Sequence, residues 1–209
     1  MSEIIENTVQ QFLDQLASKS ATPGGGSAAA LMGVQAAALT SMVCRLTIGK
    51  PQYQGVESQM QQLLAQSEQL RAELTSMIKA DVDVFNQLMA AYAMPKATEL
   101  EKTERSAMIQ NVLKQATEVP LTCARLCRTA ITLSHEAALH GYTGVISDAG
   151  VAVLAAYSGL KSAALNVYIN TGSIKDATFT ENKLAELQAI LDGAEQLTEH
   201  VYQTVKDKL

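Results

Sequence analysis

The chain has 209 residues, of which 47% are hydrophobic and 4% aromatic, and it contains no Trp. This length suits one domain, which we expect to span residues 1–209, and an apolar content carried by Ala, Leu and Met favours helices over sheets. The formal net charge of −5 argues against a nucleic-acid partner, which would need a basic face. No basic segment followed by an apolar one opens the chain, so we expect a cytoplasmic protein.

The first predicted helix covers residues 3–17 and is amphipathic. Its apolar side chains fall on one side: Ile5, Val9, Phe12, Leu13 and Leu16. A second helix is predicted over about residues 27–48, with small residues at spacings that let another backbone come close. Its apolar stretch ends at Arg45. It is shorter and less hydrophobic than a membrane span, which needs about twenty strongly apolar residues. We therefore expect a helix buried in a bundle and no membrane partner.

Four further helices are predicted, over about residues 52–92, 99–138, 147–170 and 180–208. The first of them carries a stripe of apolar residues at the helical period. The second contains Pro120, which we expect to kink it. The third is apolar or small nearly all round, which is typical of a central helix. The sequence therefore predicts an all-α, single-domain, up-and-down bundle of long helices.

A run of three glycines, Gly24, Gly25 and Gly26, precedes Ser27 and the second predicted helix. Glycines in series are entropically costly, so they indicate a sharp bend or a close approach of the backbone to another group. The free N–H groups at a helix start suit an anion or an electron-rich ligand. The alternative is a tight turn in which Ser27 caps the helix. Neither the P-loop nor the dinucleotide-binding pattern is present, which argues against a nucleotide.

Two carboxylates lie close together in the long helix predicted over residues 52–92. A rotation of 100° per residue places Asp81 between Ile78 and Phe85 on the apolar face, and Asp83 on the opposite side. A carboxylate that faces a core has a raised pKa unless it is paired. That property suits a general acid–base group at neutral pH. Asp81 is therefore the first catalytic candidate, and its alternative is a structural Asp bonded to a buried Arg or hydroxyl.

Other polar residues are weaker candidates. Asp148 stands at the start of a helix, where capping and the helix dipole also explain an acidic residue. Asn166 and Asn170 lie one turn apart on an apolar helix, where a buried amide needs partners. Lys50 follows a helix end, where a positive charge is also favourable without any ligand.

The three cysteines, Cys44, Cys123 and Cys127, suggest reduced thiols. Cys123 and Cys127 are one helical turn apart, but no second pair of ligands accompanies them, so we expect buried apolar roles and no metal.

Eight segments, in this order, resemble the formiminotetrahydrofolate cyclodeaminase and methenyltetrahydrofolate cyclohydrolase family. They are Thr22-Pro23-Gly24-Gly25-Gly26-Ser27, Met42-Val43, Leu46-Thr47-Ile48-Gly49-Lys50, Asp81-Val82-Asp83-Val84-Phe85, Met94-Pro95-Lys96, Glu118-Val119-Pro120-Leu121, and Ser147-Asp148 followed by Asn166-Val167-Tyr168-Ile169-Asn170. The resemblance covers nearly the whole chain. It implies an all-α homodimer that acts on folate one-carbon units without a metal, nucleotide or other cofactor. It also implies that Asp81, the first acidic residue of the Asp-x-[Asp/Glu]-x-Phe motif, is a proton donor.

On this basis we expect a cyclohydrolase that converts 5,10-methenyltetrahydrofolate into 10-formyltetrahydrofolate. Asp81 would deprotonate the attacking water and then protonate N5, and Asp148 would favour the cationic methenyl bridge. The segment Gly24–Ser27, Lys50 and Asn166 would bind the substrate.

Two alternatives stay open at this point. A cyclodeaminase that releases ammonia would use the same groups. In the animal form of the family a transferase domain precedes this one, whereas here Met1 begins directly at the first predicted helix, so we place the cyclohydrolase first. A non-catalytic bundle that binds a small anion would instead have Asp81 ion-paired in the core and no hollow near Gly24–Ser27.

Overall fold

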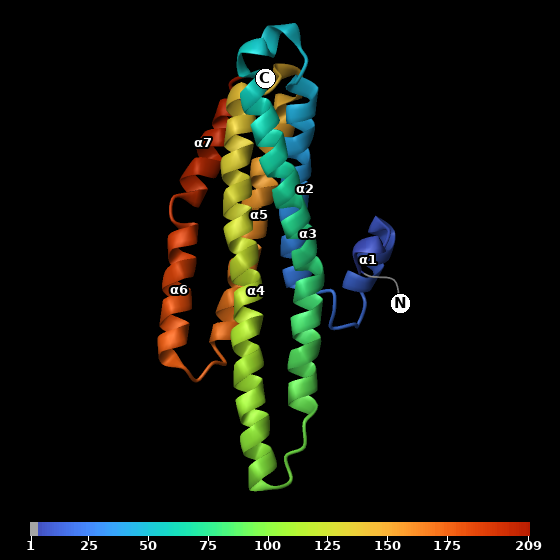
Figure 1. Ribbon diagram of the computed structural model, residues 1–209, viewed down its shortest axis with the longest axis vertical. Coiled ribbons are helices and arrows are strands. Elements are labelled where there is room, and N and C mark those ends of the chain that lie inside the picture. The colour runs from blue at the N-terminus through green and yellow to red at the C-terminus, as the bar shows by residue number, and fades with distance from the viewer. Residues whose placement is uncertain (1–3) are drawn as a thin grey trace.

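The computed structural model describes residues 4–209, and every regular element in that range is a helix. The α-helices are α1 Val9–Leu16, α2 Gly25–Thr47, α3 Glu57–Ala93, α4 Glu99–His140, α5 Ile146–Thr171, α6 Ala177–Leu191 and α7 Ala194–Lys206. Three short 3₁₀ turns cover Ile4–Glu6, Pro51–Val56 and Thr143–Val145. The all-α, up-and-down prediction is confirmed (Figure 1).

Helices α2, α3, α4 and α5 pack together as four neighbours, and α3 and α4 then continue well past the ends of α2 and α5 (Figure 1). The apolar core is divided accordingly. A large cluster fills the four-helix part, and a smaller one, whose buried residues come from α3 and α4, fills the two-helix part. On α3 the division falls between Ile78 and Val84, and on α4 between Ala116 and Leu121. Asp81 and Pro120 both lie in this gap, at the level where the bundle loses two of its helices.

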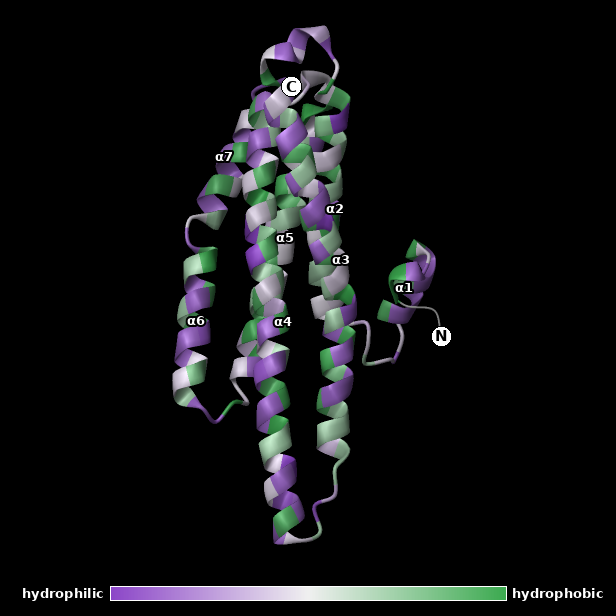
Figure 2. Cartoon of the chain, in the orientation of Figure 1, coloured by the Kyte–Doolittle hydropathy of each residue, from purple (hydrophilic) through white to green (hydrophobic). Residues whose placement is uncertain are grey.

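The amino-terminal region differs from the single amphipathic helix predicted over residues 3–17. Glu3 lies outside the described residues, and the rest forms a 3₁₀ turn followed by α1, which Thr8 caps. Of the five apolar residues predicted on one side, only Phe12 is buried. Figures 1 and 2 show α1 beside the bundle rather than within it, so this helix covers little of the core.

The predicted final helix over residues 180–208 is wrong, because it is two helices. Helix α6 ends at Leu191 and α7 begins at Ala194. The break is at Gly193, whose φ of 66° lies in the left-handed region that glycine adopts without strain. Pro120, in contrast, lies inside α4, which continues without a break from Glu99 to His140.

Two segments, Gly25–Thr47 and Thr143–Thr171, are long and apolar enough to cross a membrane by length and composition. Inside the bundle, 56% and 44% of their most apolar windows are buried. The exposed remainder of α5 includes Val151, Leu165 and Ile169, of which Ile169 is 73% exposed. Helix α5 therefore carries apolar side chains that the rest of residues 4–209 leaves exposed.

Candidate functional site

The Asp81 carboxyl lies at the amino-terminal end of α2, although Asp81 belongs to α3. Its Oδ2 accepts two hydrogen bonds of 2.8 Å, one from the backbone N–H of Ser27 and one from its hydroxyl. The residue that caps α2 by backbone geometry is Gly24, which has no side chain to offer. Asp81 thus supplies from another helix the acceptor that the first turn of α2 lacks. Ser27 is buried within that turn, so the alternative that Ser27 is the cap is wrong.

The pKa of the Asp81 carboxyl is raised above its usual value, because burial disfavours the charged form. The hydrogen bonds from Ser27 stabilise the carboxylate and oppose part of that rise. Within residues 4–209, no Lys, Arg or His forms an ion pair with Asp81, and its Oδ1 has no hydrogen-bond partner there. One oxygen is therefore fixed and the other is available, which is the arrangement that a proton-transfer group needs.

The three glycines of the loop have different surroundings. A Cβ on Gly26 would overlap with Oδ1 of Asp81, so this position requires glycine as long as the carboxyl stays in place. A Cβ on Gly24 or Gly25 would meet its nearest neighbours only at 3.7 Å and 3.8 Å, which is ordinary van der Waals contact. No contact within residues 4–209 therefore requires glycine at positions 24 and 25.

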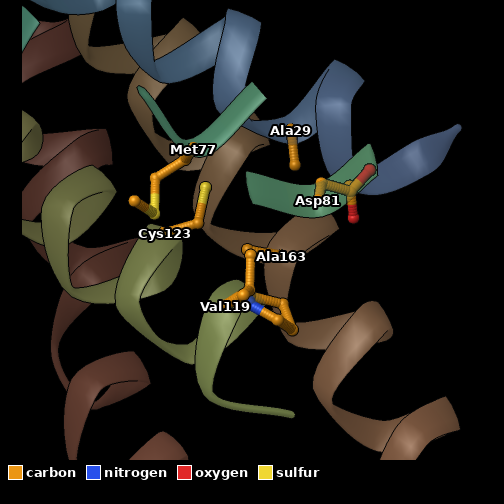
Figure 3. A pocket seen from close by; sticks show the side chains of 8 residues that line it. Ala29, Met77, Asp81, Val119, Cys123 and Ala163 are labelled. Carbon is orange, nitrogen blue, oxygen red and sulfur yellow. The ribbon is translucent and has the colours of Figure 1, made fainter. Parts of the chain in front are cut away.

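A small cavity lies beside the carboxyl, at the gap between the two apolar clusters. It has a volume of about 10 Å³, roughly the room that one water molecule occupies. Its walls are Gly26, Ala29, Met77, Asp81, Val119, Pro120, Cys123 and Ala163. In the view of Figure 3, Met77 and Cys123 lie at one end and the Asp81 carboxyl at the other. The cavity thus has one charged group among mostly apolar walls.

Asn166 is the second polar side chain near the loop. Its amide nitrogen lies 3.8 Å from the point where a Cβ on Gly25 would stand. The same nitrogen donates to the carbonyl of Ser162 at 2.9 Å. Asn166 therefore borders the exposed first turn of α2, next to the glycine that this chain leaves uncovered.

The structure separates the two carboxylates of α3 as the periodicity predicts. Asp83 is exposed and forms an ion pair of 2.6 Å with Lys79, one turn earlier on α3. Asp81 faces the bundle. The prediction that one carboxylate is solvated and the other is not is confirmed.

Lys50 and Asp148 do not lie with the other site residues. Lys50 follows the carboxyl end of α2, about 30 Å from Ser27 at a rise of about 1.5 Å per residue. There its ammonium lies 4.0 Å from the centre of the Tyr142 ring. Asp148 is in the first turn of α5, which begins at that same end, because the N–H of Tyr142 just before it donates to the Thr47 hydroxyl at the end of α2. One chain therefore gathers Gly24–Ser27, Asp81 and Asn166, but not all the predicted residues.

All three cysteines are free and buried. Cys123 lines the cavity beside Asp81. Of the residues that line the cavity, Gly26 and Asp81 were predicted site residues, whereas Cys123 and the remaining walls were not. Ala29, Met77 and Ala163 look like ordinary core residues in the sequence. Two signals marked this stretch of α4: Pro120 inside a predicted helix, and the segment Glu118–Leu121 in the family resemblance.

The sequence and the fold match known proteins. Residues 8–189 match the family model described as formiminotransferase-cyclodeaminase. The chain is 54% identical to methenyltetrahydrofolate cyclohydrolase of Methylorubrum extorquens over 97% of both chains. It is 32% identical to formimidoyltransferase-cyclodeaminase of Rattus norvegicus over 91% of this chain, which corresponds to 35% of the rat protein.

A crystal structure of formiminotetrahydrofolate cyclodeaminase from Thermotoga maritima has the same fold. It superposes with a TM-score of 0.84 at 31% sequence identity, over 99% of this chain and 98% of the other. The chain belongs to the formiminotransferase-cyclodeaminase family.

Proposed function

We propose that this protein is a methenyltetrahydrofolate cyclohydrolase, which hydrolyses 5,10-methenyltetrahydrofolate to 10-formyltetrahydrofolate in a reversible reaction. The main support for a cyclohydrolase is the 54% identity, over nearly the full length of both chains, to a protein of that name. The half-buried Asp81 carboxyl, fixed at Oδ2 and available at Oδ1, supports the same reaction.

The reaction has two steps that need opposite proton transfers. In the first, the Asp81 carboxylate accepts a proton from water while the water oxygen bonds to the electrophilic methenyl carbon, which gives a neutral adduct. In the second, the bond from that carbon to N5 breaks, N5 takes the proton from Asp81, and the adduct hydroxyl loses its proton to solvent as the formyl group forms. One carboxyl with a raised pKa serves both steps and returns to its starting form. These steps use no metal or cofactor.

The cavity beside Asp81 fits the water rather than the folate. At about 10 Å³ it has room for one water molecule, so the pterin must lie outside it, over the first turn of α2. Gly24 and Gly25 leave that turn uncovered, and Asn166 borders it. We assign substrate binding to Gly24–Ser27 and Asn166 on these grounds.

We also propose that the protein is a homodimer, formed through the exposed apolar side chains of α5 and the adjoining surface of α2, which packs beside it. Val151, Leu165 and Ile169 are more than half exposed there, and such a face favours association. A two-fold axis near the middle of α2 would set the two copies of this helix antiparallel. Lys50 and Asp148 of one copy would then approach the Asp81 end of the other, where they would attract the glutamate tail and stabilise the methenyl cation.

The second candidate is a formiminotetrahydrofolate cyclodeaminase, with Asp81 protonating the departing amine. The match to the Thermotoga maritima protein of that name favours it. The non-catalytic bundle is disfavoured, because Asp81 has no ion-pair partner within residues 4–209 and a cavity adjoins it.

An absorbance assay distinguishes these functions. Adding the protein to 5,10-methenyltetrahydrofolate should accelerate the loss of the methenyl chromophore. A protein that leaves the chromophore unchanged but releases ammonia from 5-formiminotetrahydrofolate is a cyclodeaminase instead. A protein that catalyses neither reaction would overturn the enzymatic proposal.

A further inference from the structure

Pro120 leaves a gap in the hydrogen bonds of α4, and a side chain from another helix fills it. Proline has no backbone N–H, so Pro120 cannot donate to the carbonyl of Ala116, four residues earlier. The carbonyl of Ala116, a buried residue, instead accepts a hydrogen bond of 2.6 Å from Nδ2 of Asn170, near the end of α5. The hydrogen bond from Asn170, 54 positions along the chain, thus replaces the backbone hydrogen bond to Ala116 that any other residue at position 120 would donate.

This replacement lies against the candidate site. Pro120 and its neighbour Val119 form one wall of the cavity whose other side carries the Asp81 carboxyl. Ala116 belongs to the smaller apolar cluster and Leu121 to the larger one, so the two clusters meet at this turn of α4. The hydrogen bond from Asn170 therefore joins α5 to α4 at the boundary between the two clusters.

The same hydrogen bond also ties the wall to the segment that carries Asn166. Asn166 lies one helical turn before Asn170 on α5, beside Gly25. Asn170 itself does not line the cavity. A change at Asn170 would therefore act on the site only through the positions of Pro120 and of the end of α5.

We propose that Asn170 is a positioning residue for the reaction: by bonding the Ala116 carbonyl, it holds the proline-interrupted turn of α4 as the wall that faces Asp81. The proposal rests on the proposed function, because it assigns the cavity to the attacking water. Proline contributes a rigid apolar ring without an N–H, and Asn170 satisfies the carbonyl that the ring leaves open.

A double-mutant cycle tests the pairing: Asn170→Ala, Pro120→Ala and the double variant. An alanine at position 120 restores the N–H that the Ala116 carbonyl needs, so Asn170 should become dispensable for that bond. We expect Asn170→Ala to lower kcat by at least about tenfold in the wild-type background and by less than about twofold in the Pro120→Ala background. Pro120→Ala alone should also lower kcat, because the wall moves. Asn182→Ala, an exposed change on α6, is the control and should leave activity unchanged.

The stability of the same variants gives an independent readout. Asn170→Ala should lower the denaturation midpoint in the wild-type background and have little effect beside Pro120→Ala. If Asn170→Ala does not fold, the double variant should fold. Equal kcat in Asn170→Ala and wild type, or the same loss in both backgrounds, would overturn the positioning role. A wild-type protein that catalyses neither folate reaction would instead overturn the proposed function, and the positioning role with it.

Discussion

The Asp81 carboxyl packs directly against Gly26, so that a Cβ on the glycine would overlap with Oδ1 of the carboxyl. Gly26→Ala should therefore displace the carboxyl and lower kcat by about 100-fold, since misplacement of a reacting group by about 1 Å has an effect of this size. Steady-state kinetics with the methenyl substrate measure it.

Gly25→Ala is the matched comparison, because its Cβ would meet nothing closer than 3.8 Å in this chain. This variant should keep its thermal stability. If the pterin lies over the first turn of α2, its KM should rise while kcat changes less. A Gly26→Ala variant with wild-type kcat would show that the carboxyl position is not important.

Ser27 lowers the pKa of Asp81 through its hydroxyl as well as its N–H. Ser27→Ala removes the hydroxyl and keeps the N–H, so the pKa of Asp81 should rise further. The acidic limb of the pH profile of kcat should shift to higher pH in this variant. A limb that stays in place, or shifts to lower pH, would mean that another group controls it.

The periodicity of α3 made this part of the site predictable. Asp81 and Asp83 are two residues apart, and the helical rotation alone assigns one to the core and the other to solvent. The distance along the bundle also follows from the sequence: the helix predicted over residues 27–48, at a rise of about 1.5 Å per residue, puts Ser27 and Lys50 at opposite ends. Assigning both to one substrate therefore required a second copy of the chain.

Two further features could not be predicted from local patterns. The apolar residues of α6 and α7 continue in helical period across Gly193, so the break depends on one backbone conformation with positive φ. The bond between Asn170 and the Ala116 carbonyl joins residues far apart in the sequence. Pro120 indicated an unsatisfied carbonyl, but not which side chain would satisfy it.

The pH dependence of stability provides a test of burial that does not need the substrate. Burial raises the pKa of Asp81 in the folded state above the unfolded value of about 3.9. Between these two values the folded protein binds more protons than the unfolded chain, so stability falls as the pH rises through this window. Asp81→Asn removes the titration, and its free energy of unfolding should therefore increase relative to wild type as the pH rises from about 4 through the raised pKa of the folded state. Denaturant titrations across this range measure the difference, and a difference that does not vary with pH would contradict the burial.

The proposed homodimer predicts complementation between two defective variants. Lys50→Ala and Asp81→Asn should each be impaired when assembled alone. Mixed dimers, formed by refolding the two together, contain one site with both residues intact if Lys50 acts across the interface. Activity should then recover to about a quarter of wild type, because half of the dimers are mixed and each holds one intact site. Sedimentation of the wild-type protein as a monomer, or no recovery on mixing, would contradict the proposed dimer.

The turnover of Asp81→Asn compared with Asp83→Asn tests most directly whether the half-buried carboxyl transfers the protons. Both changes remove one charge from α3, two residues apart, but Asp83 is solvated and paired with Lys79. With helical content intact in both, kcat for methenyl hydrolysis should fall by about 100-fold to 10,000-fold in Asp81→Asn and stay near wild type in Asp83→Asn. Full activity in a folded Asp81→Asn protein would contradict the mechanism.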